Sequence, residues 1–404
     1  MRMLHVVSSM NPNTGGVCQG IRNTLPEIES LGYRSDVVCL DGRDATYDMQ
    51  DSFPVIRLGA RRGPWSYSRH LHRWLIESLP QYDAVVTNGL WLYHSFAVSR
   101  AVAGLKRKKT TNIPRVYVMP HGMLDPWFQR TPSRRLKAYR NWLYWKTIEN
   151  RVISQADGIL FTCQRELELA RETFRPYRPQ RETNIGYGVP APPPRNGQME
   201  RAFRRECPTL GDQRYLLFLS RIHPKKGVDL LLRAYAKVAA NASSGAMPAL
   251  VIAGPKESAY ATEMQQLAQQ LGLARSGARA DSGVPGVHFP GMLRDDAKWG
   301  AFYGCDAFVL PSHQENFGIA VVEALACGKP VLVSDQVNIW KEISDSNAGI
   351  ARPDSLDGTQ QLLEAWLDPK AHLGAMKAED CLSCFRRYFL PQAAAQNLVQ
   401  ALAG

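Results

Sequence analysis

The sequence predicts an α/β protein with two doubly wound domains, each built around a parallel sheet. Two series of short apolar runs alternate with helix-length segments, which is the pattern of parallel strands and their crossover helices. A proline-rich stretch without core-forming residues separates the two series. The chain has 404 residues, 45% of them hydrophobic, and is long enough to bury two cores.

The first predicted domain comprises residues 1–190. Its first helix is indicated by apolar residues at three- and four-residue steps, from Val17 through Ile21, Leu25 and Ile28 to Leu31. The polar, proline-rich stretch 191–197 predicts the linker to the second domain. The buried strands are predicted at 4–7, 37–40, 84–86 and 116–118.

The second predicted domain comprises residues 191–390 and shows the alternation more clearly. Its strands are predicted at 215–219, 249–252, 287–289, 307–310 and 331–333. Ligands of such Rossmann-like sheets bind beyond the carboxyl ends of the strands, so the residues that follow each strand are the informative ones. Residues 373–403 predict helices with a break at Pro391, and we expect the last helix, about 391–404, to pack back on the first domain.

The net charge of +12 is concentrated in the first domain. Residues 1–190 hold 27 Lys and Arg against 16 Asp and Glu, whereas the remainder holds 22 against 21. This asymmetry predicts a polyanionic partner, either a nucleic acid or an anionic membrane surface. We find no apolar run of about 18 residues that could span a membrane and no targeting signal at the start.

The eight cysteines are scattered, as is typical of reduced thiols in a cytoplasmic protein. Only Cys381 and Cys384 have the close spacing of metal ligands. A zinc ion needs four ligands, so we predict no metal site there.

Two cations follow the strand predicted at 215–219. Arg221 and Lys226 lie five residues apart in the turn 220–227, directly before a predicted helix. The free N–H groups and the dipole of a helix N-terminus already favour an anion, and two cations strengthen that preference. The turn therefore predicts a diphosphate site.

Two carboxylates follow the strand predicted at 307–310. Glu315 lies in the loop, and Glu323 lies eight residues later in a helix that we expect to begin near Gly318. A carboxylate in such an apolar helix needs a partner, and a ribose diol is a suitable one. Gly318 would let the backbone approach a phosphate or a sugar.

These motifs carry a family resemblance. The segment 220–227, with Gly254-Pro255, Phe289-Pro290-Gly291 and the spacing Pro311-Ser312-x2-Glu315-x7-Glu323, resembles the large retaining glycosyltransferase family 4. The first domain adds Gly15-Gly16 and Pro120-His121-Gly122, which are also similar to that family. The resemblance spans nearly the whole chain and implies the GT-B fold, in which two Rossmann-like domains face a central cleft.

The resemblance implies that a nucleoside-diphosphate sugar is the co-substrate. Arg221 and Lys226 would hold its diphosphate and neutralise the departing nucleotide, Glu323 would bind the ribose, and Glu315 would face the transferred sugar. His121 would reach the donor sugar from the acceptor-side domain. The further positions implied in donor binding are Gly15, Gly16, Gly254, Gly291, Met292, Asn316, Phe317, Gly318 and Ile319.

The implied chemistry is transfer of a hexosyl group with retention of configuration. Fixed cations stabilise the leaving diphosphate without a metal, and the chain has no Asp-x-Asp motif, so we expect no cofactor and no obligatory divalent ion. Paired carboxylates are not required, and Glu315 is not assigned as a nucleophile. The stretch 276–283 resembles an insertion and leaves recognition of the base open.

The segment 100–151 holds thirteen basic residues and two acids, interleaved with aromatic residues that include Trp127, Phe128, Tyr139 and Trp142. Such a mixture suits an anionic bilayer surface, although it also suits RNA or a solvated face above buried aromatics. We favour the membrane over nucleic acid. The surface we assign to membrane or acceptor binding contains Arg130, Arg134, Arg135 and Lys137.

We therefore expect a cytoplasmic transferase, peripheral on the inner face of the membrane, that acts on a lipid-linked or saccharide acceptor in surface polysaccharide or glycolipid synthesis. A nucleotide-sugar epimerase and a non-catalytic partner that binds a nucleotide sugar or a membrane are the alternatives. A dinucleotide dehydrogenase is disfavoured, because no Gly-x-Gly-x-x-Gly follows the first strand.

Overall fold

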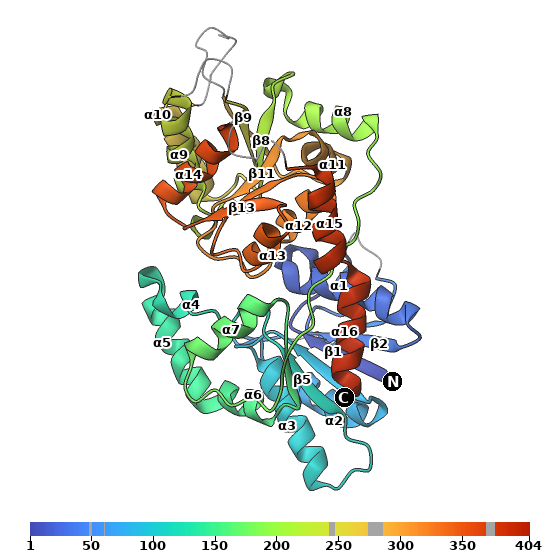
Figure 1. Ribbon diagram of the computed structural model, residues 1–404. Helices are drawn as coiled ribbons and strands as arrows, with labels where there is room; N and C mark the ends of the chain where they lie inside the picture. Colours follow the sequence, from blue (N-terminus) through green and yellow to red (C-terminus); the bar gives the residue numbers. More distant parts are fainter. Residues whose placement is uncertain (48–50, 60, 242–246, 274–285, 369–375) are drawn as a thin grey trace. The chain divides into compact units, whose positions relative to one another are not determined.

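The computed structural model describes residues 1–47, 51–59, 61–241, 247–273, 286–368 and 376–404. The chain forms two compact units, shown in Figure 1. Unit 1 contains Met1–Pro190 and Leu390–Gly404, and unit 2 contains Ala191–Phe389. Residues 191–196 carry no helix or strand, but Gly197, which we assigned to the linker, is the first residue of a helix.

Unit 1 is built on a seven-stranded sheet in the order β3-β2-β1-β4-β5-β6-β7, and its described strand pairs are parallel. The strands predicted from the sequence fall in β1, β2, β4 and β5, whereas β3, β6 and β7 were missed. The bounds are β1 Arg2–Val7, β2 Arg34–Cys39, β3 Val55–Arg57, β4 Ala84–Asn88, β5 Arg115–Met119, β6 Gly158–Phe161 and β7 Glu182–Asn184.

Helices cover both faces of this sheet. Successive side chains of a strand point to opposite faces, so Val37 lies in one buried core and Val38 in the other. Helices α1 and α16 cover the Val37 face, where Ile21 of α1 and Leu398 of α16 belong to the same core. The helix bounds are α1 Gly16–Ser30, α2 Arg69–Ser78, α3 Tyr93–Arg107, α4 Trp127–Arg130, α5 Arg135–Tyr144, α6 Asn150–Gln155, α7 Gln164–Thr173 and α16 Pro391–Ala403.

The periodic apolar positions of α1 are buried, apart from its two ends. Val17 is half-buried, and Leu31 is the exposed residue that caps the helix after Ser30. The predicted break at Pro391 is confirmed, because α15 ends at Tyr388 and Pro391 is the first residue of α16.

Unit 2 is built on a six-stranded sheet in the order β10-β9-β8-β11-β12-β13, again with parallel pairs. All five predicted strands are present, and the edge strand β13 was missed. The bounds are β8 Tyr215–Leu219, β9 Ala249–Ala253, β10 Val287–Gly291, β11 Ala307–Leu310, β12 Val331–Ser334 and β13 Gly349–Arg352.

The helices of unit 2 form two groups. Helices α9, α10 and α14 pack together, and α8 packs on α11 while α12 packs on α15 (Figure 1). Their bounds are α8 Gly197–Glu206, α9 Val228–Asn241, α10 Ala259–Gln270, α11 Asp295–Gly304, α12 Ile319–Ala326, α13 Trp340–Asp345, α14 Leu356–Leu367 and α15 Ala378–Tyr388.

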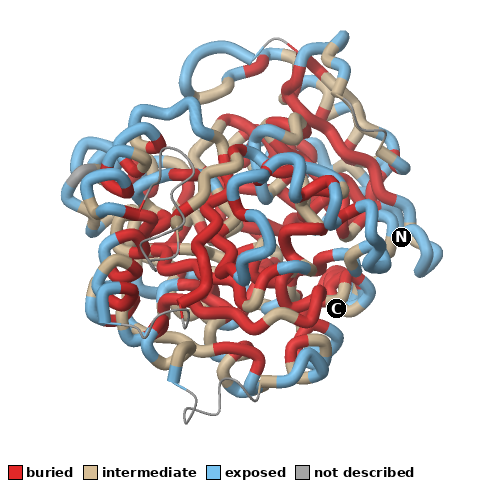
Figure 2. Tube along the Cα trace, turned by 90° about the horizontal axis from the view of Figure 1, so that it is seen from above, coloured by how far each residue is buried: buried red, intermediate tan, exposed pale blue. Residues whose placement is uncertain are grey.

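Each sheet has one point at which the strand order reverses. In unit 1 this topological switch point lies between β1 and β4, and in unit 2 it lies between β8 and β11. Most strand residues of both sheets are buried, and Figure 2 shows the chain coloured by burial, with buried residues in red and exposed ones in pale blue. Loops at the carboxyl ends of parallel strands that flank a switch point enclose a ligand crevice in this fold class.

Candidate functional site

The cation-bearing turn of unit 2 is locked against the loop that follows β11. The turn contains a 3-10 helix, Pro224–Lys226, and ends at Gly227, which has a left-handed φ of 68°. A Cβ atom at Gly227 would lie 2.0 Å from the carbonyl oxygen of Pro311, so only glycine permits this approach. The hydroxyl of Ser312 donates to the carbonyl oxygen of Lys225 at 2.9 Å.

This close approach brings Lys226 and Glu315 together. The Nζ atom of Lys226 donates to Oε2 of Glu315, and the two side chains are 7% and 19% exposed. Burial by itself raises the pKa of Glu315, but Lys226, and more weakly Lys225 and Arg221, lower it below its ordinary value. Glu315 is therefore ionised at neutral pH, with the exposed Arg221 beside it.

The backbone of Glu315 is also held by the loop that follows β12. Its N–H donates to the carbonyl oxygen of Gln336 at 2.9 Å, and the N–H of Asn338 donates to its carbonyl oxygen at 3.0 Å. The loops after β8, β11 and β12 thus form one connected framework, and Glu315 has little freedom to leave Lys226.

The second carboxylate, Glu323, has a protein partner that we did not anticipate. It lies on α12, and its Oε1 atom accepts a hydrogen bond of 2.7 Å from Nζ of Lys298 on α11. Burial raises the pKa of Glu323, and Lys298 opposes that rise. Lys298 is thus the partner that a carboxylate in this apolar helix needs, and the second oxygen of Glu323 can still accept from a ribose hydroxyl, so the ribose contact stays a prediction.

The segment between the two carboxylates turns the chain into α12. Gly318 has a left-handed φ of 84° and precedes the first residue of the helix, Ile319. Phe317 is buried and packs edge-on against Phe389, and the side chain of Asn316 accepts from Asn338 at 3.4 Å. The N-terminus of α12, with its partial positive charge, begins four residues after Glu315.

Three further predicted positions lie at neighbouring strand ends of unit 2. The N–H of Gly254, after β9, donates to the carbonyl oxygen of Gly291, at the end of β10, at 2.9 Å. A Cβ atom at Gly254 would lie 2.1 Å from the carbonyl oxygen of Ser220, which precedes Arg221. Met292 is 55% exposed beside them. The stretch 276–283 lies outside the described residues.

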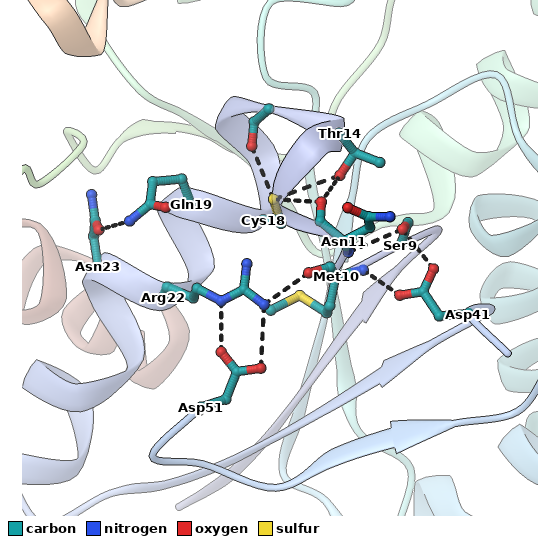
Figure 3. Close-up of polar contacts among 11 residues, drawn as sticks. Ser9, Met10, Asn11, Thr14, Cys18, Gln19, Arg22, Asn23, Asp41 and Asp51 are labelled. Atoms are coloured by element: carbon teal, nitrogen blue, oxygen red, sulfur yellow. Dashed lines mark hydrogen bonds and ion pairs between the residues drawn. The ribbon is translucent and has the colours of Figure 1, made fainter. Parts of the chain in front are cut away.

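The glycine-containing loop of unit 1 is held by two acidic side chains (Figure 3). The carboxylate of Asp41 accepts from the hydroxyl of Ser9 and the N–H of Met10, both at 2.6 Å. Arg22 of α1 donates to the carbonyl oxygen of Met10 at 2.8 Å and pairs with Asp51 at 2.6 Å. These bonds fix the loop that leads into Gly15 and Gly16.

Gly15 and Gly16 mark the start of α1. Gly15 has a φ of 97° and precedes the helix, which begins at Gly16. The carbonyl oxygen of Gly16 accepts a hydrogen bond of 2.8 Å from the hydroxyl of Tyr187. The helix N-terminus is thus set at the switch point of unit 1, where its N–H groups suit an anion.

A chain of three polar side chains spans the same switch point. His121, after β5, has a left-handed φ of 52°, and its Nε2 atom lies 3.1 Å from Oδ1 of Asn88 at the end of β4. The Nδ2 atom of Asn88 donates to the carbonyl oxygen of Val86 at 3.2 Å and lies 3.5 Å from Nδ1 of His5 in β1. Neither His5 nor Asn88 belongs to a motif that the sequence predicts as part of a site.

The hydrogen bonds of Asn88 determine which nitrogen of His121 carries the proton, and burial keeps both histidines neutral. Because the amide nitrogen of Asn88 faces a carbonyl oxygen, its amide oxygen must accept from His121, which therefore carries its proton on Nε2. Burial, and secondarily the nearby His5, lower the pKa of His121 to about 3. Burial lowers the pKa of His5 to about 4. Both rings are neutral at physiological pH.

The four basic residues assigned to a membrane or acceptor surface differ in their surroundings. Arg130 pairs with Glu172 at 3.7 Å, and Arg134 lies over the ring of Phe128, 5.1 Å from its centre. Arg135 and Lys137 are exposed on α5. Of the aromatic residues in this segment, Trp145 is fully buried and cannot contribute to a surface.

All eight cysteines are free and buried, in agreement with the predicted thiols. In the part of the chain that the structure describes, no three His, Cys, Asp or Glu side chains lie close enough together to hold a metal ion. Within the same residues, no helix is long and apolar enough to cross a membrane.

Both halves of the chain match known protein families. Residues 15–188 match a glycosyl transferase 4-like domain, and residues 200–368 match the glycosyl transferases group 1. Two Rossmann-like units, each built on a parallel sheet and matched in this order, define a glycosyltransferase of the GT-B fold. The chain belongs to the group 1 glycosyl transferases, as its resemblance to family 4 predicted.

Curated relatives match about half of the chain. The D-inositol 3-phosphate glycosyltransferase 2 of Catenulispora acidiphila is 31% identical over 208 residues, which are 50% of this chain and 45% of that protein. The D-inositol 3-phosphate glycosyltransferase of Thermobispora bispora is 32% identical over 214 residues, with the same coverage. The matched stretch thus spans less than half the length of these relatives.

Solved structures match the whole chain and show the fold. The HepE protein of Anabaena in complex with UDP superposes with a TM-score of 0.72 at 17% identity, covering 100% of both chains. A glycosyltransferase of Rickettsia africae gives 0.73 at 14% identity, covering 99% of this chain and 97% of that one. The fold of both units is therefore that of GT-B glycosyltransferases.

The hydrogen bond between Asn88 and His121 predicts a titration. In Asn88→Asp, a carboxylate would replace the amide oxygen and favour the imidazolium, so the pKa of His121 should rise above its value of about 3. NMR titration of the imidazole nitrogens measures it, with the exposed His223 as an internal control and His121→Gln for assignment. An unchanged His121 titration would contradict the assigned hydrogen bond.

The ion pair between Lys226 and Glu315 predicts a non-additive stability effect. Glu315→Gln leaves a buried cation without its partner and should lower the free energy of unfolding by about 3 kcal/mol, whereas Lys226→Met combined with Glu315→Gln should recover most of that loss. Because the pKa of Glu315 is lowered in the folded chain, the stabilisation is present above pH 4.5 and is lost as the pH falls through the lowered pKa.

Urea denaturation at pH 7 and pH 4 measures this effect. The matched control is Glu379→Gln, which breaks the exposed pair with Arg386 in the same unit and should change stability by less than about 0.5 kcal/mol. Losses that simply add in the double variant would show that the two side chains do not interact.

Proposed function

We propose that this protein is a retaining glycosyltransferase that moves a hexosyl group from a nucleoside-diphosphate sugar to a lipid-linked or saccharide acceptor. The observation that carries the proposal is the buried pair of Lys226 and Glu315 at the switch point of unit 2, with Arg221 beside it. The N-terminus of α12 lies four residues after Glu315. The family membership supports the transferase, and the described geometry supports the roles below.

The cations would stabilise the departing nucleoside diphosphate. Cleavage of the glycosyl–phosphate bond leaves negative charge on the diphosphate, and fixed cations close to it lower the barrier. Lys226 has three N–H donors, so it can keep its bond to Glu315 and still donate to a phosphate oxygen. Glu315 holds the flexible lysine stem in place, which reduces the entropy lost when the donor binds.

The polar groups around the cations would position the sugar and the nucleoside. Glu323 would accept from the ribose hydroxyls through the oxygen that Lys298 does not occupy, and Glu315 would face the transferred sugar. His121 is neutral and would offer hydrogen bonds rather than charge to the sugar. Gly15, Gly16, Gly254, Gly291, Met292 and residues 316–319 would contribute backbone contacts.

The donor class is supported by what related structures contain. HepE of Anabaena was solved with UDP-glucose, and a trehalose-6-phosphate protein of E. coli was solved with UDP-2-fluoro glucose. UDP-glucose is therefore the first donor to test. WaaG, described as a glycosyltransferase involved in lipopolysaccharide biosynthesis, has the same fold, which supports a surface polysaccharide or glycolipid as the product.

Loss of Arg221 tests the leaving-group role. Arg221→Ala should lower turnover by about a hundredfold or more, because it removes a charge that stabilises the diphosphate in the transition state. The assay follows nucleoside diphosphate release from UDP-glucose and a panel of other nucleotide sugars, with saccharide and lipid-linked acceptors. Arg205→Ala, which removes another exposed arginine of unit 2, is the matched control and should leave turnover unchanged. Full turnover in a folded Arg221→Ala protein would refute the proposed role.

Metal independence is a separate expectation. Because Arg221, Lys226 and a helix N-terminus would supply the compensating charge, turnover in excess EDTA should stay within about twofold of that in its absence. The measurement compares initial rates with EDTA, without EDTA, and with EDTA followed by excess magnesium. A complete loss that magnesium restores would assign the charge compensation to a metal ion instead.

A further inference from the structure

Helix α5 carries an apolar face that the rest of unit 1 leaves uncovered. Among the described residues, eight large apolar side chains are exposed, and four of them lie on this ten-residue helix. Leu136 is 89% exposed, Tyr139 65%, Leu143 49% and Trp142 47%. We call these four residues the α5 face. Contiguous exposed apolar side chains of this kind mark an interaction site.

The opposite side of the helix fixes the direction of this face. Leu136, Tyr139 and Leu143 follow the i, i+3, i+7 spacing of one helical face. Asn141 on the other side is buried, and Trp145, directly after α5, is fully buried and stacks on Phe174. The α5 face therefore cannot turn inward without removing Trp145 from the core. Figure 1 shows α5 on the outside of unit 1.

Cations border the α5 face. Arg135, Lys137, Arg140 and Lys146 are exposed around it, and Nζ of Lys146 lies over the ring of Trp142, 5.9 Å from its centre. The sequence has no acidic residue between Asp125 and Glu149, and Glu149 is fully buried. Arg130 and Arg134 are engaged with Glu172 and with aromatic rings, so the bordering cations differ from the set suggested by the sequence.

The residues of the α5 face and the cations around it fit some kinds of partner better than others. A second copy related by a twofold axis would place the same cations against one another, which is unfavourable. RNA would pair with cations and stack on Tyr139 and Trp142, but it offers no apolar partner for Leu136 and Leu143. An anionic bilayer offers headgroup charge for the cations, acyl chains for the leucines and an interfacial layer for Tyr and Trp.

We propose that the α5 face inserts into the headgroup–acyl boundary of an anionic membrane, with Arg135, Lys137, Arg140 and Lys146 at the lipid headgroups. This surface would hold the enzyme where a lipid-linked acceptor lies. That link to the acceptor rests on the proposed function, whereas membrane binding by the α5 face does not require turnover.

The test uses the full chain and vesicles, without donor or acceptor. Wild-type protein should co-sediment with vesicles of phosphatidylcholine and phosphatidylglycerol (about 7:3) at about 0.1 M salt, and not with pure phosphatidylcholine. Leu136→Ser with Leu143→Ser should lower the partition coefficient about tenfold or more, since each leucine loses its apolar partner. Arg135→Ser with Lys137→Ser and Arg140→Ser should have a similar effect at low salt.

A matched control and an insertion readout separate this proposal from simple charge attraction. Leu31→Ser changes another exposed leucine of unit 1 and should bind as wild type does. Lipids brominated in the acyl chain should quench the fluorescence of wild-type protein, and Trp142→Phe should remove most of that quenching. Circular dichroism and thermal unfolding check that each variant is folded.

The outcomes decide the proposal in both directions. Tenfold weaker binding of the leucine variant together with Trp142-dependent quenching would establish insertion of the α5 face. Equal binding of wild type and the leucine variant, or recovery of both in the supernatant, would overturn it. The proposal would also be overturned if wild type bound RNA but no vesicles and the α5 variants lost the RNA binding. That result would assign the face to RNA. Failure of the transferase assay alone would leave the vesicle result standing and would refute only the proposed function.

Discussion

The arrangement of both sites follows from one constraint, namely that parallel strands present all their carboxyl ends at one edge of a sheet. Where the strand order reverses, the chains leaving two adjacent strands diverge and the loops between them are left to enclose a ligand. In unit 2 this happens between β8 and β11, which brings Lys226 and Glu315 together across 89 positions of sequence. In unit 1 it happens between β1 and β4, which places the glycine-containing loop and Asn88 at the same edge.

At the carboxyl ends of the strands in unit 2, burial requires each carboxylate to have a cation beside it. A carboxylate removed from water is stable only beside a cation, and each carboxylate of this site has one: Lys226 for Glu315 and Lys298 for Glu323. The lysines are therefore oriented before any ligand arrives. In the proposed function, the exposed Arg221 would compensate the charge of a diphosphate. Such prior orientation favours electrostatic stabilisation of a leaving group over mere attraction of an anion.

The sequence predicted the features that depend on local pattern and missed those that depend on distant contacts. The interior strands β8, β9, β11 and β12 are apolar except for Ser334 and were predicted closely. The edge strands β3, β7 and β13 have only three or four residues, partly exposed, and give no clear signal. Arg221, Lys226, Glu315 and Glu323 followed from motifs. Lys298 lies on another helix, 25 positions before Glu323, and Asn88 has no motif of its own, so only the folded chain reveals either. The outward direction of Leu136 likewise depends on Trp145 being taken into the core.

The net charge of each unit differs from the charge at its switch point. Unit 2 has almost no net charge, because residues 191–404 hold 22 Lys and Arg against 21 Asp and Glu and the segment 390–404, which belongs to unit 1, has none of these residues. It nevertheless places cations at its switch point. The first 190 residues carry nearly all of the excess, but the groups at their switch point, His5, Asn88 and His121, are uncharged, because burial lowers the pKa of both histidines. The excess therefore lies elsewhere, and part of it lies on α5, where Arg135, Lys137 and Arg140 are exposed beside uncovered leucines. A surface charge of this kind acts on large anionic partners rather than on the reacting atoms, so we expect the two kinds of positive charge in this molecule to serve different partners.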